Sequence, residues 1–301
     1  MAIKTIGLMS PGDMGNEIGK VLLKNKYRVI TSLNGRSDRT RDLCFKAGIE
    51  DLRDLHMVVN ESDLILSIMP PSEAEVFANE VMKIIQDLKV EPLYAECNAI
   101  APSTSERIRL LISSAGALYV DAGIIGPPPG RGEATRLYVS GKYAEQILPL
   151  GGENLKIISL GKEWARSSAL KMCYAALTKG TMTLDTAVLL AGKQLGVYEE
   201  LKTEFSESQP EAFNRMNNRI PWLSTDARRW IGEMNEIRNT LEVSQLPGGF
   251  HRGAAEIFSL LSESPLAIET VENADRSRTL DEAINIFAEM IRINPEESNQ
   301  S

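Results

Sequence analysis

The sequence predicts an α/β fold, in which a doubly wound, mostly parallel sheet is followed by an all-helical C-terminal domain. Two observations predict it. Up to residue 160, short apolar runs alternate with amphipathic stretches, which is typical of parallel strands joined by crossover helices. After Gly161 no further strand-like run occurs, and helical patterns separated by prolines follow. We therefore expect one domain at residues 1–163, a second at 164–296 and a flexible tail at 297–301.

Seven apolar runs are bounded by turn residues and have the length of buried strands. They lie at residues 5–9, 28–33, 63–69, 92–97, 118–124, 136–140 and 156–160. Amphipathic helices are expected between them, at residues 14–24, 38–46, 73–87 and 103–114. In the last of these, Ser103 is the expected N-cap, three residues before Glu106. The longest helical stretch, residues 164–191, is rich in Ala, Leu and Met and opens the second domain.

The composition is that of an ordinary globular protein. The 301 residues include 41 acidic and 33 basic side chains, and the formal charge of -8 argues against nucleic acid and anionic membranes as partners. No apolar run reaches the roughly 20 residues that span a bilayer, and the N-terminus begins with a strand-like segment rather than a leader. Three scattered cysteines indicate reduced thiols, and two histidines without ligand spacing predict no metal site. We expect a cytoplasmic protein.

A glycine-rich turn joins the first expected strand to the first expected helix. Glycines at this position let a phosphate approach bare backbone amides at a helix N-terminus. Gly12 and Gly15 have the spacing of the second half of a dinucleotide-binding turn, whereas Gly7 lies five residues before Gly12 and departs from the usual pattern. A strand-to-helix turn without a ligand is the alternative. The expected cofactor contacts here are Gly7, Ser10, Pro11, Gly12, Asp13, Met14 and Gly15.

The segment after the second expected strand favours NADP over NAD. An NAD site presents an acidic residue to the ribose hydroxyls about 20 residues past the glycine turn. Here residues 20–46 carry eight basic against two acidic side chains. Arginine and serine suit a 2′-phosphate, and the expected contacts are Asn34, Arg36, Ser37 and Arg39. The alternative is a solvated, charged helix face, and use of NAD stays open.

Four polar side chains recur on one face of the long helical stretch. Ser167, Lys171, Tyr174 and Thr178 are spaced by four, three and four residues. A lysine on such an apolar helix must be paired, reach outward or face a cleft that contains water. In a cleft, Lys171 can act as the general acid or base of a hydride transfer, and a structural role is the alternative. His251 follows a Pro-Gly-Gly turn and is a second candidate for a cleft, although a lone histidine is commonly a core or surface residue.

Taken together, these motifs resemble the β-hydroxyacid dehydrogenase superfamily. Within it, the chain is similar to the NAD-binding 6-phosphogluconate-dehydrogenase-like oxidoreductases whose helical C-terminal domain has no assigned function. Besides the glycine turn and the lysine helix, the resemblance rests on Ile68-Met69-Pro70-Pro71, Asn98-Ala99-Ile100-Ala101-Pro102 and Asp121-Ala122-Gly123-Ile124-Ile125-Gly126. It spans nearly the whole chain.

The resemblance implies a Rossmann cofactor domain at residues 1–163, a helical domain for substrate binding and homodimer formation at 164–296, and a substrate cleft. It places Lys171 on the family's catalytic lysine and Arg36 on the 2′-phosphate position. The family's asparagine after the lysine is replaced by Tyr174 and Ala175, and its substrate-binding serine by Ile125. These replacements make the pocket more apolar and favour substrates larger or less acidic than hydroxyisobutyrate.

Our leading hypothesis from the sequence is an NADP-dependent dehydrogenase or reductase that moves hydride between the nicotinamide and a hydroxy or oxo carbon of a small molecule. Lys171 is the expected general acid or base, and Tyr174 and Asn98 are expected to orient the substrate. Reduction of a C=N bond, as in the related imine reductases, is an alternative on the same fold. A non-catalytic NADP sensor is an alternative of another class. The expected cofactor-flanking residues are Met69, Pro70, Pro71 and Asn98, and the expected substrate contacts are Gly123, Ile124, Ile125, Ser167 and His251.

Overall fold

The computed structural model describes residues 3–270 and 272–293 of the 301-residue chain. The chain forms two compact units, Met1–Cys173 and Tyr174–Ser301. The division falls inside one long helix, α6 (Arg166–Leu195). The domain boundary expected between residues 163 and 164 lies just before this helix and stays a prediction.

The first unit is built on an eight-stranded sheet with the strand order β3-β2-β1-β4-β5-β6-β7-β8. Neighbouring strands are parallel except for β7, which runs antiparallel to β6. The expected doubly wound, mostly parallel sheet is therefore confirmed. The strand order reverses beside β1, between β1 and β4, which is where open α/β sheets bind ligands. The strands are β1 (Thr5–Met9), β2 (Arg28–Thr31), β3 (Glu50–Asp51), β4 (Leu64–Ser67), β5 (Leu93–Glu96), β6 (Leu118–Ile125), β7 (Thr135–Ser140) and β8 (Leu155–Ser159).

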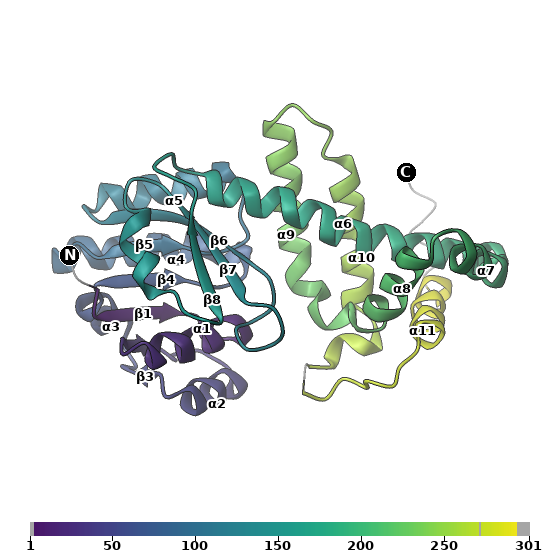
Figure 1. Ribbon diagram of the computed structural model, residues 1–301, viewed down its shortest axis with the longest axis horizontal. Coiled ribbons are helices and arrows are strands. Elements are labelled where there is room, and N and C mark those ends of the chain that lie inside the picture. Colours follow the sequence, from purple (N-terminus) through teal and green to yellow (C-terminus); the bar gives the residue numbers. More distant parts are fainter. Residues whose placement is uncertain (1–2, 271, 294–301) are drawn as a thin grey trace. The chain divides into compact units, whose positions relative to one another are not determined.

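Helices cover both faces of this sheet (Figure 1). One face is covered by α1 (Asp13–Lys24), α2 (Asp38–Ala47) and the 3-10 helix η1 (Ala144–Leu150). The other is covered by α3 (Leu55–Glu61), α4 (Pro71–Leu88) and α5 (Pro102–Ser114). Because helices lie on both faces, the parallel strands are buried on both sides, and this is why they read as continuous apolar runs.

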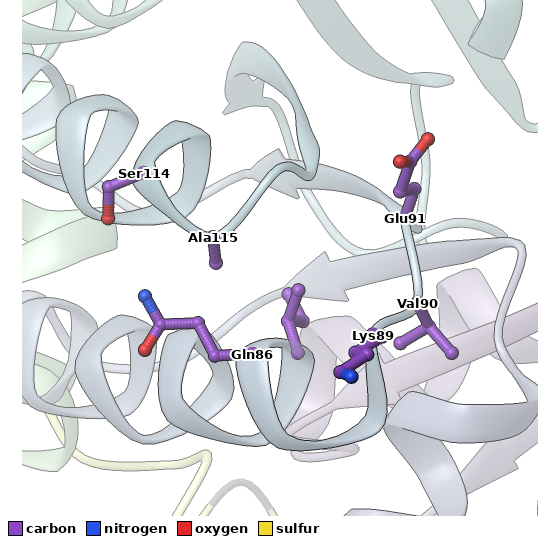
Figure 2. A pocket seen from close by; sticks show the side chains of 7 residues that line it. Gln86, Lys89, Val90, Glu91, Ser114 and Ala115 are labelled. Carbon is purple, nitrogen blue, oxygen red and sulfur yellow. The ribbon is translucent and has the colours of Figure 1, made fainter.

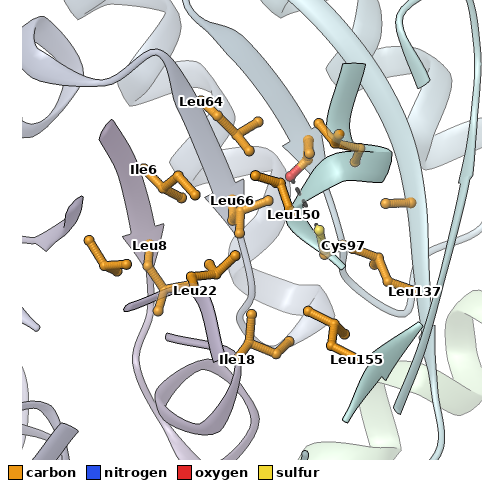
Figure 3. Close-up of a cluster of buried hydrophobic side chains, with 14 of the residues drawn as sticks. Ile6, Leu8, Ile18, Leu22, Leu64, Leu66, Cys97, Leu137, Leu150 and Leu155 are labelled. Carbon is orange, nitrogen blue, oxygen red and sulfur yellow. Dashed lines mark hydrogen bonds between the residues drawn. The ribbon is translucent and has the colours of Figure 1, made fainter. Parts of the chain in front are cut away.

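Successive residues of the central strands point to opposite faces, so each strand contributes to both apolar layers. In β1, Ile6 and Leu8 belong to the layer under α1, and Met9 belongs to the other. Figure 3 shows the first layer, in which these two side chains lie in one cluster with Ile18 and Leu22 of α1. The packing of α1 on β1 fixes the position of the turn that joins them.

The N-cap expected for α5 is wrong. The helix begins at Pro102, and its N-cap is Ala101, which has extended backbone and makes no side-chain hydrogen bond. Proline is favoured at the first helical position because it lacks the N–H that a cap would bond, and it disfavours helical backbone in the preceding residue. The proline therefore sets the start of the helix, and Ser103 lies inside its first turn.

The regular elements of the second unit are all helices within its described residues. Within it, α9 and α10 pack against each other, and the Trp230 and Phe258 rings meet edge to face with 5.2 Å between their centroids. In α6, a Cβ on Gly180 would lie 2.9 Å from Phe250 Cε1, so glycine allows α10 to approach closely. The helices after α6 are α7 (Tyr198–Ser208), α8 (Pro210–Arg219), η2 (Ile220–Trp222), α9 (Ser224–Val243), α10 (Gly249–Ser262), η3 (Pro265–Ile268) and α11 (Leu280–Ile293).

Candidate cofactor and active site

The turn between β1 and α1 depends on glycine at two positions, for different reasons. α1 starts at Asp13, so the amides of its first turn have no acceptor within the helix. Gly12 is the N-cap, and a Cβ there would have no neighbour within 4 Å. At Gly15 a Cβ would lie 2.6 Å from the Ser10 carbonyl oxygen, so only glycine fits. A phosphate can approach these amides without meeting a side chain at Gly12, and the helix dipole favours its charge.

Gly7 has a different role from the other two glycines. It lies inside β1, where a Cβ would be 2.5 Å from Ser62 Oγ and 3.0 Å from Val58 Cγ1. Glycine at this position allows α3 and the residue after it to lie close to β1. The turn itself begins after Met9, which explains the irregular spacing between Gly7 and Gly12. A contact between Gly7 and a cofactor stays a prediction.

Two arginines near the start of α2 lie close to this turn. Arg39 Nη2 is 2.7 Å from Asp13 Oδ1, in the first turn of α1. Arg36 Nη1 is 3.7 Å from Glu73 Oε2, near the start of α4. Ser37 is the N-cap of α2, and Asn34 precedes it in the loop after β2. The structure therefore brings the basic segment and the glycine turn to the same edge of the sheet.

Hydrogen bonds join the turns that follow β1, β4 and β5. The Ser10 amide donates to the Ile68 carbonyl at 2.8 Å, and the Met69 amide donates to Asn98 Oδ1 at 2.5 Å. α4 then begins at Pro71, directly after this contact. Because all three turns follow the carboxyl ends of parallel strands, they form one continuous edge at the reversal of strand order. The sequence-predicted residues at this edge are Ser10, Pro11, Met69, Pro70, Pro71 and Asn98.

Asn98 is buried, and its side chain ties two strands together. Its Nδ2 donates to Ser67 Oγ at 2.9 Å, while its Oδ1 accepts the Met69 amide. Its backbone amide donates to Glu96 Oε1 at 3.0 Å. Glu96 is itself buried, and this burial raises the pKa of its carboxyl group to about 8. Asn98 thus fixes the loop after β4, and a direct role in orienting a substrate stays a prediction.

Asp121 of β6 is a second buried carboxyl group, and it holds the start of α6. Its Oδ2 accepts the backbone amides of Ser167 and Ser168, each at 2.9 Å. The Ser105 hydroxyl donates to Asp121 Oδ1 at 2.8 Å, and the Ser140 hydroxyl donates to Oδ2 at 2.9 Å. Burial raises the pKa of Asp121, and these donors oppose the shift. No role was assigned to Asp121 from the sequence, although one acidic side chain inside an apolar strand is a sign of a buried polar network.

α6 approaches β6 closely at Gly123, next to Lys171. A Cβ on Gly123 would lie 2.9 Å from the Ser167 carbonyl oxygen and 3.0 Å from Lys171 Cβ. Lys171 is half-buried, and the two isoleucines that follow Gly123 are buried. Lys171 and the glycine turn therefore belong to the same compact unit.

The polar side chains expected on one face of α6 have different environments. Ser167 is buried, and its Oγ has no hydrogen-bond partner among the described residues. Tyr174 is 45% exposed, and its carbonyl oxygen accepts from Thr178 Oγ1 at 3.1 Å. In the second unit, His251 of α10 is buried with its Nε2 at 3.2 Å from the Ala176 carbonyl oxygen. His251 is therefore packed against α6, and its contact with a substrate stays a prediction.

A cavity of about 290 Å³ lies at the other edge of the sheet, where α4 and α5 end and β5 and β6 begin (Figure 2). Because this edge carries the amino ends of the strands, the cavity is remote from the turns that follow β1, β4 and β5. It is not the candidate site. Its lining residues are Ile85, Gln86, Lys89, Val90, Glu91, Ser114 and Ala115.

Neither a metal centre nor a membrane span is present in the part of the chain that the structure describes. Within residues 3–270 and 272–293, no group of three or more histidine, cysteine, aspartate or glutamate side chains could hold a metal ion. In the same ranges, no helix combines the length and the apolar character that a membrane crossing requires.

A glycine turn at the start of the first helix, next to the reversal of strand order, defines a dinucleotide-binding α/β domain. Residues 3–147 match the model of the NAD binding domain of 6-phosphogluconate dehydrogenase. Residues 193–261 match a domain of unknown function, DUF1932. The two matches together bear out the resemblance inferred from the motifs, to 6-phosphogluconate-dehydrogenase-like oxidoreductases with a helical C-terminal domain of unassigned function.

Two relatives align with this chain over different lengths. An uncharacterised 28.5 kDa protein of Methanothermus fervidus is 25% identical over 233 residues, which are 77% of this chain and 88% of that protein. The mitochondrial 3-hydroxyisobutyrate dehydrogenase of Mus musculus is 30% identical over 132 residues, which are 42% of this chain and 38% of the mouse protein. The second match therefore spans well under half of the mouse enzyme.

Solved structures share the fold over nearly the whole chain. The 3-hydroxyisobutyrate dehydrogenase of Mycobacterium tuberculosis, in a structure with L-serine, has a TM-score of 0.61 at 15% identity and covers 95% of this chain and 99% of its own. An imine reductase variant of Myxococcus stipitatus in complex with NAD+ has a TM-score of 0.51 at 16% identity, with the same two coverages of 95% and 99%. At these identities the likeness shows the fold alone.

Proposed function

We propose that the protein is an NADP-dependent oxidoreductase that transfers hydride between the nicotinamide and the hydroxy or oxo carbon of a small, hydroxy-acid-like substrate. One observation carries the proposal. The unit that holds the glycine turn also holds Lys171, which lies on the second turn of α6 against Gly123. A phosphate-binding helix N-terminus and a fixed proton donor are the two contributions that such a reaction needs from the protein.

The residues at the turn fit a pyridine dinucleotide. The space at Gly12 and the close contact at Gly15 leave the first-turn amides of α1 accessible to a pyrophosphate. Arg36 and Arg39 supply positive charge for a 2′-phosphate, and an arginine has five N–H donors, so it can bond several groups at once. When bound, the cofactor supplies the hydride chemistry. The protein binds and orients it at this edge of the sheet.

Lys171 is the proposed general acid of the reduction and the general base of the oxidation. Its ε-amino group holds the proton that the substrate oxygen gains or loses. Tyr174, one turn further along α6, and Asn98, at the end of β5, are the proposed orienting residues. The apolar side chain of Ile125, at the end of β6, favours substrates less acidic than hydroxyisobutyrate.

Reduction of a C=N bond is the second candidate. It is favoured by the apolar character of Ile125, which is buried and offers no side-chain group to hold a carboxylate. An imine reductase also shares the fold. In this reading Lys171 protonates the nitrogen instead of the oxygen.

We also propose a homodimer that forms through the helical domain. In the second unit, α6 carries a series of largely apolar residues at alternating spacings of three and four, which is typical of a helix that packs along another helix. Leu177 is 73% exposed, Leu184 49% and Leu195 77%. A second copy of this chain is the proposed cover for this surface. The series, named here the α6 stripe, consists of Leu177, Thr181, Leu184, Val188, Ala191 and Leu195.

The cytoplasm is the proposed location. Cys44, Cys97 and Cys173 are free thiols, and Cys173 is exposed. Free thiols persist in a reducing compartment, whereas secreted proteins commonly pair them.

The function is tested by cofactor titration followed by a substrate panel. NADPH and NADH are titrated by fluorescence, and turnover is then measured with 3-hydroxyisobutyrate, 6-phosphogluconate, L-serine, aryl-substituted 3-hydroxy acids, their oxo forms and 1-pyrroline. We expect tighter binding of NADPH than of NADH and turnover of a hydroxy or oxo acid. Turnover of 1-pyrroline alone would favour the second candidate. Binding of NADPH without any turnover would favour a non-catalytic sensor, and no binding would contradict the proposal.

A further inference from the structure

Two buried carboxyl groups lie side by side in the sheet, and each is bonded to a different part of the candidate site. Glu96 of β5 and Asp121 of β6 are partners in the parallel register, and each is 1% exposed. Glu96 accepts the amide of Asn98, whereas Asp121 accepts the amides that begin α6. Burying a carboxyl group is unfavourable unless it accepts hydrogen bonds. The hydrogen bonds that each carboxyl group accepts therefore indicate its structural role.

Asp121 provides the acceptor that the start of α6 requires. The amides of Ser167 and Ser168 lie in the first turn, where a helix leaves its N–H groups without partners, and the helix dipole favours a carboxylate there. Ser140 of β7 strengthens the same anchor. Its Oγ donates to Asp121 Oδ2 at 2.9 Å and accepts from the Ser167 amide at 3.1 Å.

This anchor also determines where Lys171 lies. Lys171 follows Ser167 by four residues, which is about one helical turn. The Ser167 amide is bonded to Asp121, and the Ser167 carbonyl oxygen lies against Gly123. Asp121 and Gly123 are two residues apart on β6 and so face the same side of the strand. The first turn of α6 is therefore held by β6 at two points, and Lys171 Cβ lies beside the second.

We propose that Asp121 is a positioning residue for Lys171: by anchoring the start of α6 on β6, it sets where the ε-amino group lies. The inference rests on the proposed function, in which Lys171 is the general acid. It goes beyond that function because no contact with the cofactor or the substrate is assigned to Asp121. Its effect on the reaction passes through Lys171 alone.

The substitution Asp121→Asn tests the anchor. It keeps the size of the side chain but removes its charge and replaces one acceptor oxygen by a donor, which opposes the helix amides. We expect hydrogen exchange at Ser167 and Ser168 to speed up about tenfold or more. The NMR resonance of ¹³C-methylated Lys171 should move towards that of an exposed lysine. The turnover number should fall about tenfold to a hundredfold, because small displacements of a catalytic group have effects of this size, while the Kd of NADPH stays unchanged.

Two further variants separate positioning from stability. Ser62→Ala removes a hydroxyl whose Oγ donates to the Val58 carbonyl at 2.6 Å, elsewhere in the same unit, and it should leave the Lys171 resonance unchanged. Ser140→Ala removes one arm of the anchor and should act in the same direction as Asp121→Asn, more weakly. If Asp121→Asn yields too little folded protein, the same measurements are made on Ser140→Ala instead.

The outcomes distinguish the inference from the function on which it rests. If Asp121→Asn lowers the melting temperature but leaves the Lys171 resonance and the turnover number unchanged, Asp121 is only a helix cap and the inference is overturned. In the Lys171→Ala background, Asp121→Asn should cause no further loss of turnover, and a further loss would also overturn it. If the proposed function itself is wrong, Lys171→Ala keeps full turnover. The changes that Asp121→Asn causes in the Lys171 resonance and in hydrogen exchange would still be observed in that case.

Discussion

Arg39 Nη2 lies 2.7 Å from Asp13 Oδ1, so the first turn of α2 is tied to the first turn of α1. Both side chains are more than a third exposed, at 36% and 37%, so this ion pair contributes little to stability. Its importance is positional. It holds a guanidinium group beside the helix N-terminus at which we propose the cofactor phosphates to bind.

Replacing Arg36 should change the cofactor preference. We expect Arg36→Ala to raise the Kd of NADPH about ten- to a hundredfold, because a hydrogen bond to a charged group contributes a free energy of this size. The Kd of NADH should stay nearly unchanged, since NADH has no 2′-phosphate. Fluorescence titration measures both. Arg107→Ala is the control, because Arg107 pairs with Glu75 on the outer surface of α4 and α5. Equal losses for the two cofactors would contradict a 2′-phosphate contact.

The two glycines of the turn should respond differently to alanine. At Gly15 the added Cβ would lie 2.6 Å from the Ser10 carbonyl oxygen, so Gly15→Ala should lower both the melting temperature and the affinity for NADPH. At Gly12 the backbone φ is -74° and the space is empty, so Gly12→Ala should fold normally and lose affinity alone. Thermal melts and NADPH titrations measure the two effects. Normal NADPH binding by Gly12→Ala would show that no phosphate lies at this amide.

The free energy of unfolding should fall as the pH rises from about 4.5 to about 8, because of Glu96. Burial raises the pKa of Glu96 from 4.5 to about 8, so over this range the folded chain holds a proton that the unfolded chain has lost. The stabilisation from this group is complete below the lower pKa and is lost as the pH passes the higher one. One such proton gives a slope of about 1.4 kcal/mol per pH unit.

Urea unfolding of Glu96→Gln across this range isolates the effect. The amide keeps an oxygen for the Asn98 backbone N–H but cannot titrate. We expect a flatter profile than that of the wild type and a higher free energy of unfolding above pH 8. Asp121, whose pKa burial also raises, contributes with the same sign in both proteins. Parallel profiles for the two proteins would mean that Glu96 is ionised when folded.

A charge on the α6 stripe should dissociate the homodimer. Leu177→Glu places a carboxylate on the surface that we propose is covered by the second copy, so light scattering after size exclusion should show a monomer. Leu110→Glu is the control, since Leu110 is a 54% exposed leucine on α5 of the first unit. A Leu177→Glu protein with the oligomeric state of the wild type would exclude this surface as the interface.

The fold could be predicted where the pattern of apolar residues indicates which faces of an element are buried. The central strands were located because both of their faces are buried, and the expected bounds at residues 5–9 agree with β1. β3 and α3 were not expected. β3 has two residues and α3 seven, which is too short for either periodicity to be recognised, and β3 is defined by its pairing with β2.

The candidate site could be predicted only where its residues lie close together in the sequence. The glycine turn and the basic segment can be recognised because strand, turn and helix follow one another along the chain. The bond from Asp121 to Ser167 joins residues 46 positions apart and depends on the position of β6 beside β5 and β7. Likewise, the bond from Met69 to Asn98 exists because β4 and β5 are neighbours. Such contacts follow from the strand order, which no local pattern contains.

The most direct test of the account is the rate of hydride transfer in Lys171→Ala, measured in a single turnover with NADPH bound and the best substrate of the panel. We predict a loss of about a hundredfold or more with an unchanged Kd of NADPH, as expected for a positioned general acid. Lys193→Ala, near the other end of the same helix, should transfer hydride at the rate of the wild type. A Lys171→Ala protein that is equally fast would show that Lys171 is not the general acid.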